Sequence, residues 1–470
     1  MTYDLAVVGT GFASSFFLLT YLAHAPATAR VLVLERGPRP DRAWQLENRR
    51  TSPVDVAATF RRRGLPRKTW TFSVGFGGGS NCWWGCTPRF LPVDLKLRSA
   101  YGVGDDWPVT YDELEPFLEQ AEDVMAVAGS DEAHPYPRRR RHPQPPHRLS
   151  QPDRKLAEAY PGLFVPQPTA RARLPTRTRG ACCANGVCGL CPIDAKFTIE
   201  NGLADIYRDP RVTLRLDTEV VAVETSAGRA NGLIGLTETW KADLVVLGAG
   251  AIFNAAILQR SGIEHPLLGR RLHEQVSLSA VVELDGLDGF DGSTVITGHG
   301  YMLYDGPHRR ERGACLIETW NRPDQLRWEP GRERQLLQIK CIVEDLPQER
   351  NRVTVDSDGV PVLEFHDYSA YARRTLDALP SLVEDVLSCL PVERVLWEPE
   401  PAPTEGHILG TVVMGDDPER SIVDRWLLHH RLRNLAVLGG SAFPTASPAH
   451  PTLMISALAL RTAAYLMGRV

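Results

Sequence analysis

The hydrophobic pattern is clearest at the start of the chain. Residues 3–8 form an apolar run as long as a buried strand, and residues 12–24 have the three- and four-residue spacing of a helix. A second apolar run follows at 31–34. This order predicts a strand, a turn, a helix and a second strand parallel to the first.

The same pattern returns later in the chain. Residues 242–262 have the pattern of a buried strand, a glycine turn and a helix, and residues 434–438 and 452–467 repeat a strand and a helix. Segments this far apart in sequence can share one parallel sheet. We therefore expect an α/β, Rossmann-like domain built from non-contiguous segments.

Between these segments the spacing of the apolar residues changes. From residue 276 to about residue 400, short runs rich in β-branched residues alternate with turns, and one amphipathic helix spans 368–390. This pattern predicts an α+β second domain, an antiparallel sheet with a helix that faces the first domain.

The segment that precedes residue 170 connects the two domains. Thr110 and Glu113 form a helix-start signal, and residues 134–148 are so rich in proline and arginine that we expect an exposed loop. The predicted division is residues 1–100, 170–275 and 405–470 for the first domain, 101–169 for a connecting or lid segment, and 276–404 for the second domain.

The composition is that of an ordinary globular protein. The 470 residues are 43% hydrophobic and 23% charged, and a net charge of −4 gives no reason to expect nucleic acid as a partner. The apolar runs stop short of the ~20 residues that a transmembrane helix needs. No signal peptide is recognisable, so we expect a cytoplasmic protein, with export alongside a partner subunit left open.

The first turn has the residues of a dinucleotide site. Gly9 and Gly11 permit a tight turn and a close backbone approach, Ser14 takes the place of a third glycine, and free amides at the helix start suit a pyrophosphate. Glu35 ends the second strand, where an acid can bind ribose hydroxyls. These residues predict a dinucleotide-binding unit and leave FAD and NAD as alternatives.

Two further stretches have unusual chemistry. The loop 77–81, GGGSN, offers many bare amides to an anion or a flat ring, and Trp83 and Trp84 follow it. Four of the nine cysteines lie within ten residues, at Cys182, Cys183, Cys188 and Cys191. Thiols at this density favour an iron–sulfur cluster or zinc, with a metal-free loop as the alternative.

Several motifs in order resemble one family. GTGFAS, GGGSNCWWGCTPRF, LVVLGAGAIFNAAILQRSGI, HILGTVVMGDDPERSIVD and NLAVLGGSAFPTASPAHPTLMISALALR are similar to segments of the glucose–methanol–choline (GMC) oxidoreductases. Within the family they look most like the gluconate, glucose and fructose dehydrogenase branch and its pyranose-oxidizing relatives. The resemblance covers nearly the whole chain.

The resemblance implies non-covalent FAD, held by the first domain, with the second domain binding substrate. The positions that match the family's FAD-binding segments are Gly9, Gly11, Ser14, Glu35, Arg36, Gly78, Gly79, Ser80, Asn81, Val220, Gly248, Gly440, Ser441 and Pro451. Some relatives attach FAD to a histidine after the glycine loop. The matching stretch, 81–84, has no histidine, so we expect the FAD to dissociate.

The family's active-site pair matches His407 and His450. Most relatives of this branch have asparagine at the second position, so His450 is a departure that puts the polarity of the substrate in doubt. An alcohol that gives up a hydride must also lose its hydroxyl proton, which neutral imidazole can accept. We predict that His407 is the base and that His450 orients the substrate oxygen.

The predicted function is oxidation of a primary or secondary alcohol of a sugar, a polyol or a sugar-like metabolite. Members of the branch can carry an iron–sulfur cluster in a comparable cysteine loop, which would pass electrons to a carrier protein or a quinone. One alternative is an oxidase that produces hydrogen peroxide. Another is a flavin electron-transfer subunit without activity of its own.

Overall fold

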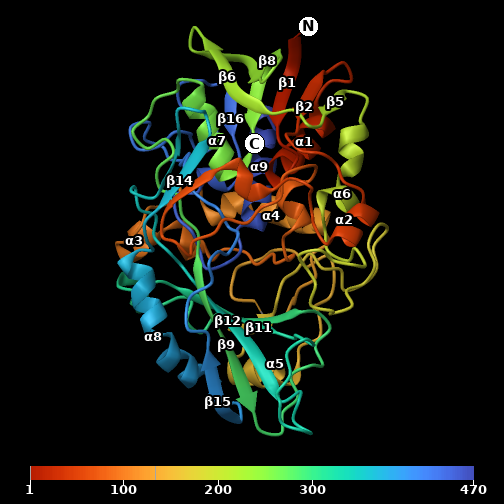
Figure 1. Cartoon of the computed structure of the whole chain (residues 1–470), viewed down its shortest axis with the longest axis vertical. Coiled ribbons are helices and arrows are strands. Elements are labelled where there is room, and N and C mark those ends of the chain that lie inside the picture. Colours follow the sequence, from red (N-terminus) through yellow and green to blue (C-terminus); the bar gives the residue numbers. More distant parts are fainter. Residues whose placement is uncertain (1, 133) are drawn as a thin grey trace.

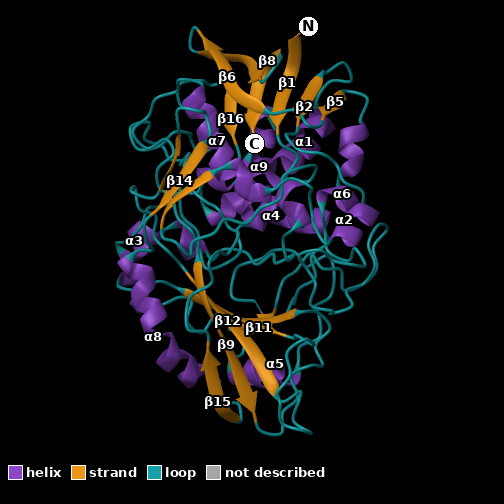
Figure 2. Cartoon of the chain, viewed as in Figure 1, coloured by secondary structure: helices purple, strands orange, loops and turns teal. Residues whose placement is uncertain are grey.

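The computed structural model describes residues 2–132 and 134–470 and forms two lobes (Figure 1). Strand β1 (Thr2–Val8) and the C-terminal helix α9 (Thr452–Leu466) belong to the same lobe. The second lobe is built around an antiparallel sheet at the opposite end of the molecule (Figure 2). The expected α/β fold with an α+β second part is confirmed.

The first lobe contains a seven-stranded sheet in the order β5-β2-β1-β8-β7-β6, with β16 beside β8. Strand β1 is parallel to β2 and β8, and β16 is parallel to β8, whereas β6, β7 and β8 pair antiparallel. Besides β1, its strands are β2 (Val31–Leu34), β5 (Val212–Arg215), β6 (Val220–Ser226), β7 (Arg229–Gly235), β8 (Thr239–Leu247) and β16 (Leu435–Val437).

Helices that begin at glycine turns cover this sheet. Helix α1 (Phe12–His24) follows β1, helix α7 (Gly250–Arg260) follows β8, and α9 packs against both α1 and α4 (Tyr111–Met125). The Gly248 amide donates to Val8 O, so the turns after β1 and β8 lie side by side. These carboxyl ends of parallel strands form the edge at which open α/β sheets bind ligands.

The second lobe contains a six-stranded antiparallel sheet in the order β15-β9-β12-β11-β10-β4. Helix α8 (Ala370–Leu387) packs against β9 and β12. The strands are β4 (Phe164–Pro166), β9 (Val276–Leu284), β10 (Ile296–Gly300), β11 (Cys315–Trp320), β12 (Leu336–Val343) and β15 (Val392–Trp397).

Two pairings cross the predicted domain boundaries. Strand β4, from the connecting segment, joins the second sheet. Strands β13 (Arg352–Val355) and β14 (Pro361–Phe365) form a small sheet with β3 (Arg61–Gly64), and α7 packs against β13 and β14. The predicted division into domains stays a prediction.

The remaining helices are short: α2 (Arg42–Asn48), α3 (Leu97–Tyr101), α5 (Gln151–Ala159) and α6 (Ile199–Gly202). In the arginine-rich loop, Arg139 and Arg140 are exposed as expected, but Arg138 is buried against Glu122 of α4. In the part of the chain that the structure describes, the helices are too short or too polar to cross a bilayer.

Candidate active site

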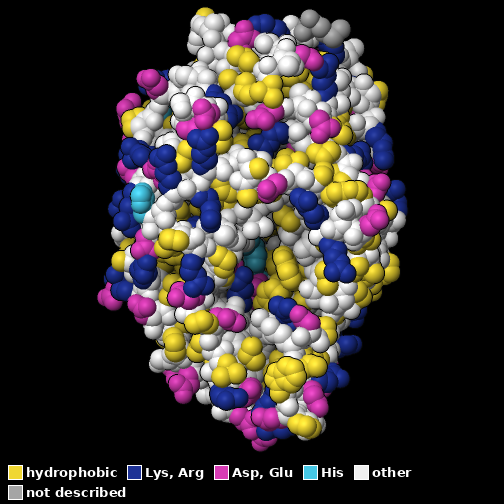
Figure 3. All heavy atoms as spheres, viewed as in Figure 1, with side chains coloured by type: hydrophobic (Ala, Val, Ile, Leu, Met, Phe, Trp, Pro, Cys, Tyr) yellow, Lys and Arg dark blue, Asp and Glu magenta, His cyan; other side chains and the backbone are white. Residues whose placement is uncertain are grey.

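One cavity of about 570 Å³ extends from the turn after β1 into the second lobe. Its walls come from the β1 and β8 turns, the loop 78–86, the segment 404–409 and strands β10, β11 and β12. Figure 3 shows a hollow near the middle of one face, with apolar and histidine side chains inside it. The cavity therefore joins the glycine turns to the residues of the second sheet.

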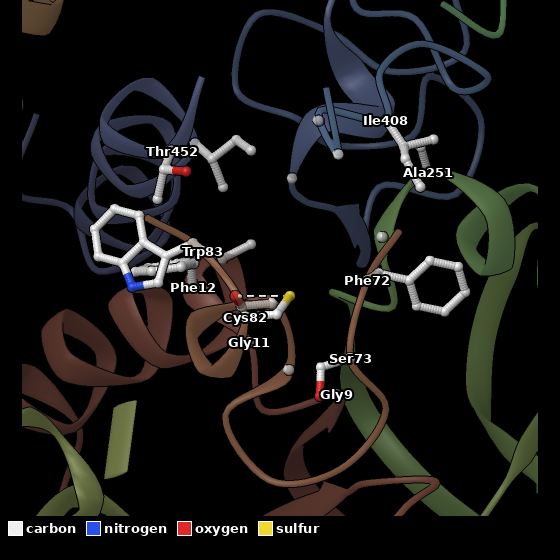
Figure 4. Close-up of a pocket in the computed structure, with 18 of the residues that line it drawn as sticks. Gly9, Gly11, Phe12, Phe72, Ser73, Cys82, Trp83, Ala251, Ile408 and Thr452 are labelled. Carbon is white, nitrogen blue, oxygen red and sulfur yellow. Dashed lines mark hydrogen bonds between the residues drawn. The ribbon is translucent and has the colours of Figure 1, made fainter. Parts of the chain in front are cut away.

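At the first-lobe end, the glycines leave space for a ligand. A Cβ atom added to Gly11 or Gly79 would meet no heavy atom within 4 Å, and both residues line the cavity. Figure 4 shows Gly9, Gly11 and Cys82 on one side of this space and Phe72 on another. Bare backbone facing an open volume suits close approach by a phosphate or a flat ring.

Glu35 and Arg36 lie at the same end. The Glu35 carboxylate is buried and accepts hydrogen bonds from Thr10 N at 3.1 Å, Thr10 Oγ1 at 2.8 Å and Gly37 N at 3.1 Å. Thr10, which sequence reasoning missed, therefore orients the acid. The Arg36 guanidinium lies 4.1 Å from the centroid of the Phe253 ring.

The predicted cofactor residues fall into two groups. Those that line the cavity are Gly9, Gly11, Glu35, Arg36, Gly78, Gly79, Val220, Gly248, Gly440 and Pro451. Those that lie behind its wall and hold backbone in place are Ser14, Ser80, Asn81 and Ser441. Ser14 is packed so closely that a Cβ on Gly248 would lie 2.0 Å from its hydroxyl oxygen and would displace that hydroxyl from its hydrogen bond with Val8 O.

His407 and His450 are brought together from separate segments. Their ring centroids lie 5.0 Å apart, the rings are nearly perpendicular, and both residues line the cavity. Burial lowers the pKa of His407 to about 4 and the pKa of His450 well below its ordinary value of 6.5. Both imidazoles are therefore neutral at physiological pH.

Gln275 determines which nitrogen of His407 carries the proton. The Gln275 amide nitrogen donates to the carbonyl oxygens of Ser447 and Ala449, so its Oε1 faces His407 Nδ1 at 3.1 Å as an acceptor. Neutral His407 must donate from Nδ1, which leaves Nε2 unprotonated. This is the tautomer that a general base requires.

Glu318 on β11 lies beside His450. Its Oε1 is 3.4 Å from His450 Nε2 and 3.1 Å from His299 Nε2. Burial alone would raise the pKa of Glu318, but the hydrogen bond with His299 and the charge of Lys340 act in the opposite direction and help to keep it below its usual value. His450 Nδ1 is buried and has no hydrogen-bond partner among the described residues.

Sequence reasoning missed the second-lobe wall of the cavity. Glu318 and Trp320 lie on one face of β11, and Lys340, the cross-strand neighbour of Glu318, pairs with Glu405 at 2.6 Å. Trp84 and Trp320 lie with ring centroids 5.1 Å apart. A signal was present, because a glutamate in the middle of the apolar run CLIETW is unusual in a buried strand.

Cys182 and Cys191 lie close enough to Cys188 to raise the pKa of its thiol, but among the described residues the four loop cysteines do not form a compact ligand set. Cys188 is buried, Cys183 is exposed, and Cys182 Sγ lies 3.5 Å from Thr294 Oγ1. Within residues 2–132 and 134–470, one group of metal-binding atoms is close enough to share an ion, and it consists of Cys86, Glu318 and His450. As placed, the loop cysteines do not support the predicted cluster.

The chain is similar to members of one enzyme family. Residues 347–459 match the C-terminal model of the family described as GMC oxidoreductase. The chain is 27% identical to the fructose dehydrogenase large subunit of Gluconobacter japonicus, over 98% of this chain and 97% of that one. It is 29% identical to 6'''-hydroxyparomomycin C oxidase of Streptomyces lividus, over 98% and 90%.

A solved structure with the same fold is pyridoxine 4-oxidase from Mesorbium loti. The two chains are 18% identical, match with a TM-score of 0.69, and are each covered to 99%. The resemblance expected from the sequence motifs is confirmed.

Proposed function

Because the chain carries a GMC oxidoreductase C-terminal domain and is homologous to members of that family over its length, we propose that it is an FAD-dependent alcohol oxidoreductase. It oxidises a primary or secondary alcohol of a sugar, a polyol or a sugar-like metabolite to a carbonyl. The observation that carries the proposal is the contact between His407 Nδ1 and Gln275 Oε1, which leaves Nε2 free to accept a proton, beside His450 in the cavity that begins at the glycine turn.

FAD fits the residues that are present. The family is FAD-dependent, and the open backbone at Gly11 and Gly79 provides a cradle that any side chain would fill. Gly9, Gly11, Glu35 and Arg36 would hold the nucleotide end, and Gly78, Gly79 and Gly440 would lie along the ring system. When bound, FAD supplies an acceptor for the hydride of the alcohol.

The chain's own residues would handle the proton. His407 Nε2 accepts the hydroxyl proton while Nδ1 keeps its own proton in the hydrogen bond to Gln275 Oε1, so the ring does not need to turn. His450 orients the substrate oxygen, and the nearby Glu318 carboxylate favours the protonated form of His450. Partial burial of these residues strengthens their electrostatic interactions.

The second-lobe wall suits a polar substrate. Glu318, Lys340 and Glu405 offer charged hydrogen-bonding groups, and Trp84 and Trp320 offer flat apolar surfaces. Such a mixture fits a molecule with several hydroxyl groups and apolar ring faces. The names of two relatives, a fructose dehydrogenase subunit and a hydroxyparomomycin oxidase, support a sugar-like substrate.

We propose a non-oxygen acceptor, a carrier protein or a quinone, because one relative is the large subunit of a dehydrogenase. The alternative of an oxidase that releases hydrogen peroxide is supported by the relative named as an oxidase. No electron step is assigned to the cysteine loop. Protein purified without oxygen can be analysed for iron and acid-labile sulfide. Absence of both would exclude an iron–sulfur cluster.

An anaerobic screen of alcohols and sugars for flavin bleaching tests the proposed function. We expect at least one polyhydroxy alcohol to bleach the flavin of the purified holoenzyme. Reoxidation by air with peroxide release would identify an oxidase, whereas slow reoxidation by air and fast reoxidation by a quinone would identify a dehydrogenase. A colourless protein that takes up no flavin would refute the proposal. Bound flavin that no alcohol bleaches would favour an electron-transfer subunit without activity of its own.

A further inference from the structure

We propose that Cys86, Glu318 and His450 bind a zinc ion inside the cavity, and that the ion blocks access of the alcohol to the histidine pair. The blocking effect rests on the proposed function, whereas binding of the ion does not.

The three ligand atoms come from distant parts of the chain and meet at the cavity wall. The Cys86 thiol, the Glu318 carboxylate and a ring nitrogen of His450 lie within 4.8 Å of one another. All three residues line the cavity. Sulfur, imidazole nitrogen and carboxylate oxygen are the ligands that zinc takes in proteins, at about 2.0 to 2.3 Å from the metal, so small side-chain movements would close the site.

The neighbours of this trio already orient two of its members. Gln167 Nε2 donates to Cys86 Sγ at 2.9 Å, and His299 Nε2 lies at hydrogen-bond distance, 3.1 Å, from Glu318 Oε1. The orientation of the Gln167 amide is set by Arg171, which donates to its oxygen. Hydrogen bonds of this kind around a metal site hold the ligands in place and tune their affinity.

The charges of the site match a divalent cation. Zinc binds the thiolate form of cysteine, so binding of the ion would release the proton of the buried Cys86 thiol. The resulting thiolate, the Glu318 carboxylate and the His450 imidazole would give the ion two anionic ligands and one nitrogen ligand. Two cationic side chains lie nearby: Lys340 is paired with Glu405, and Arg171 donates to Gln167, which in turn donates to Cys86.

Arg171 gives a second reason to expect a thiolate at this place. It is buried, and its hydrogen bonds go to neutral oxygens: Thr294 Oγ1, Ile296 O, Trp84 O and Gln167 Oε1. A buried guanidinium is stabilised by a nearby negative charge. The thiols that lie close enough to act on Arg171 are those of Cys188, Cys86 and Cys182, and a metal-bound Cys86 thiolate would supply such a charge.

The ion would keep one position open toward the cavity, because three protein ligands leave the fourth tetrahedral position to water. It would occupy a nitrogen of the same imidazole that orients the substrate oxygen in the proposed reaction. Zinc should therefore compete with the alcohol, and a chelator should restore activity.

Zinc X-ray absorption spectroscopy tests the site directly on the holoenzyme loaded with one equivalent of Zn²⁺. We expect one sulfur at about 2.3 Å and lighter ligands at about 2.0 to 2.2 Å. More than one sulfur would place the ion in the cysteine loop, and no sulfur would exclude Cys86, so either result would overturn the proposal. The spectrum can be interpreted before any substrate is known.

Variants locate the ion and test the block. In Cys86→Ser the sulfur signal should disappear and zinc affinity should fall on the order of 100-fold. Cys82→Ser is the matched control, because Cys82 also lines the cavity but is outside the trio.

Once an alcohol that bleaches the flavin is known, zinc should slow flavin reduction competitively in wild type and in Cys82→Ser. Equal inhibition of Cys86→Ser, measured against its own metal-free rate, would refute the proposal, and Cys86→Ala serves if the serine variant is unstable.

Discussion

His407 is held in a single tautomer by a residue from a different segment of the chain. Gln275 directs its oxygen at His407 Nδ1 because its amide nitrogen is occupied by the carbonyls of Ser447 and Ala449. Ala449 precedes His450 in the chain, so one glutamine side chain ties together the segments that carry both histidines. The proposed base is therefore oriented before any substrate binds.

Replacing His407 with alanine should lower the rate of flavin reduction by about 10²- to 10⁴-fold, because the hydroxyl proton loses its acceptor. Stopped-flow mixing with a bleaching alcohol in the absence of oxygen measures this rate. The control is His366→Ala, since His366 is exposed and does not line the cavity. Near-normal reduction in a flavin-loaded His407→Ala protein would show that His407 is not the base.

The pH dependence of the same rate follows from the lowered pKa of His407. A histidine with a pKa of about 4 is neutral, and able to accept a proton, at all pH values well above 4. The reduction rate should thus be level from about pH 5 to 8 and fall about tenfold per unit below about 4. If the reduction rate instead begins to fall near pH 6.5 in protein that retains its flavin, the His407 ring is exposed to water.

Gly11 offers a test of the cofactor cradle. Its φ of −73° is open to any residue, so a side chain here would act by filling the cavity and not by straining the backbone. Gly11→Val should lose most of its bound flavin after gel filtration, with the fold retained by circular dichroism. Gly180→Ala is the control, because Gly180 is exposed and its added Cβ would make only an ordinary contact. Full flavin content in Gly11→Val would contradict the cradle.

At the scale of elements, the segment 404–407 is held by a buried ion pair. Glu274 accepts hydrogen bonds from the amides of Glu405 and His407 and from Thr404 Oγ1. Lys68 pairs with Glu274, and both side chains are almost completely buried. Trp70, Phe365 and Tyr368 surround the ammonium group. The pair thus joins the first lobe to the segment that carries the proposed base.

Lys68→Met should cost about 3 to 5 kcal/mol of folding free energy, because it leaves the Glu274 carboxylate buried without its partner. Thermal unfolding of the holoenzyme should show a lower Tm, and the double variant Lys68→Met/Glu274→Gln should recover much of the loss. The exposed pair Arg215 and Glu238 provides the comparison, since Arg215→Met should change stability by at most about 1 kcal/mol. Equal effects at the two sites would contradict this role.

At the scale of the whole molecule, the cavity draws its walls from both lobes. Residues from the first sheet's turns and from strands β10, β11 and β12 line the same cavity. The stretch 81–84 beside it, Asn-Cys-Trp-Trp, contains no histidine to which FAD could be linked.

Acid precipitation of the holoenzyme should therefore release the flavin into the supernatant, because only non-covalent contacts hold it. Absorbance of the supernatant and of the redissolved pellet measures the distribution. Flavin that stays with the pellet after unfolding in guanidinium would show a covalent link.

Much of the first lobe could be predicted from the sequence alone. The period of the apolar residues, the glycines of the β1 turn and the acid at the end of β2 are local features, because each depends on neighbours within one strand–turn–helix unit. The motifs that resemble the family also located His407 and His450, which the structure then placed 5.0 Å apart between their ring centroids.

Only the tertiary structure decided what surrounds those histidines. Gln275 and Cys86 have no local signature of a role, and the glutamate in the apolar run of β11 signals only that Glu318 is unusual, because the partners of all three lie tens to hundreds of residues away along the chain. The tautomer of His407, the charge beside His450 and the thiol at the cavity wall all arise from contacts between strands and loops that meet only in the folded chain. The sequence by itself therefore determined the kind of fold and the proposed chemistry, whereas the packing of the two lobes determined the electrostatics of the site.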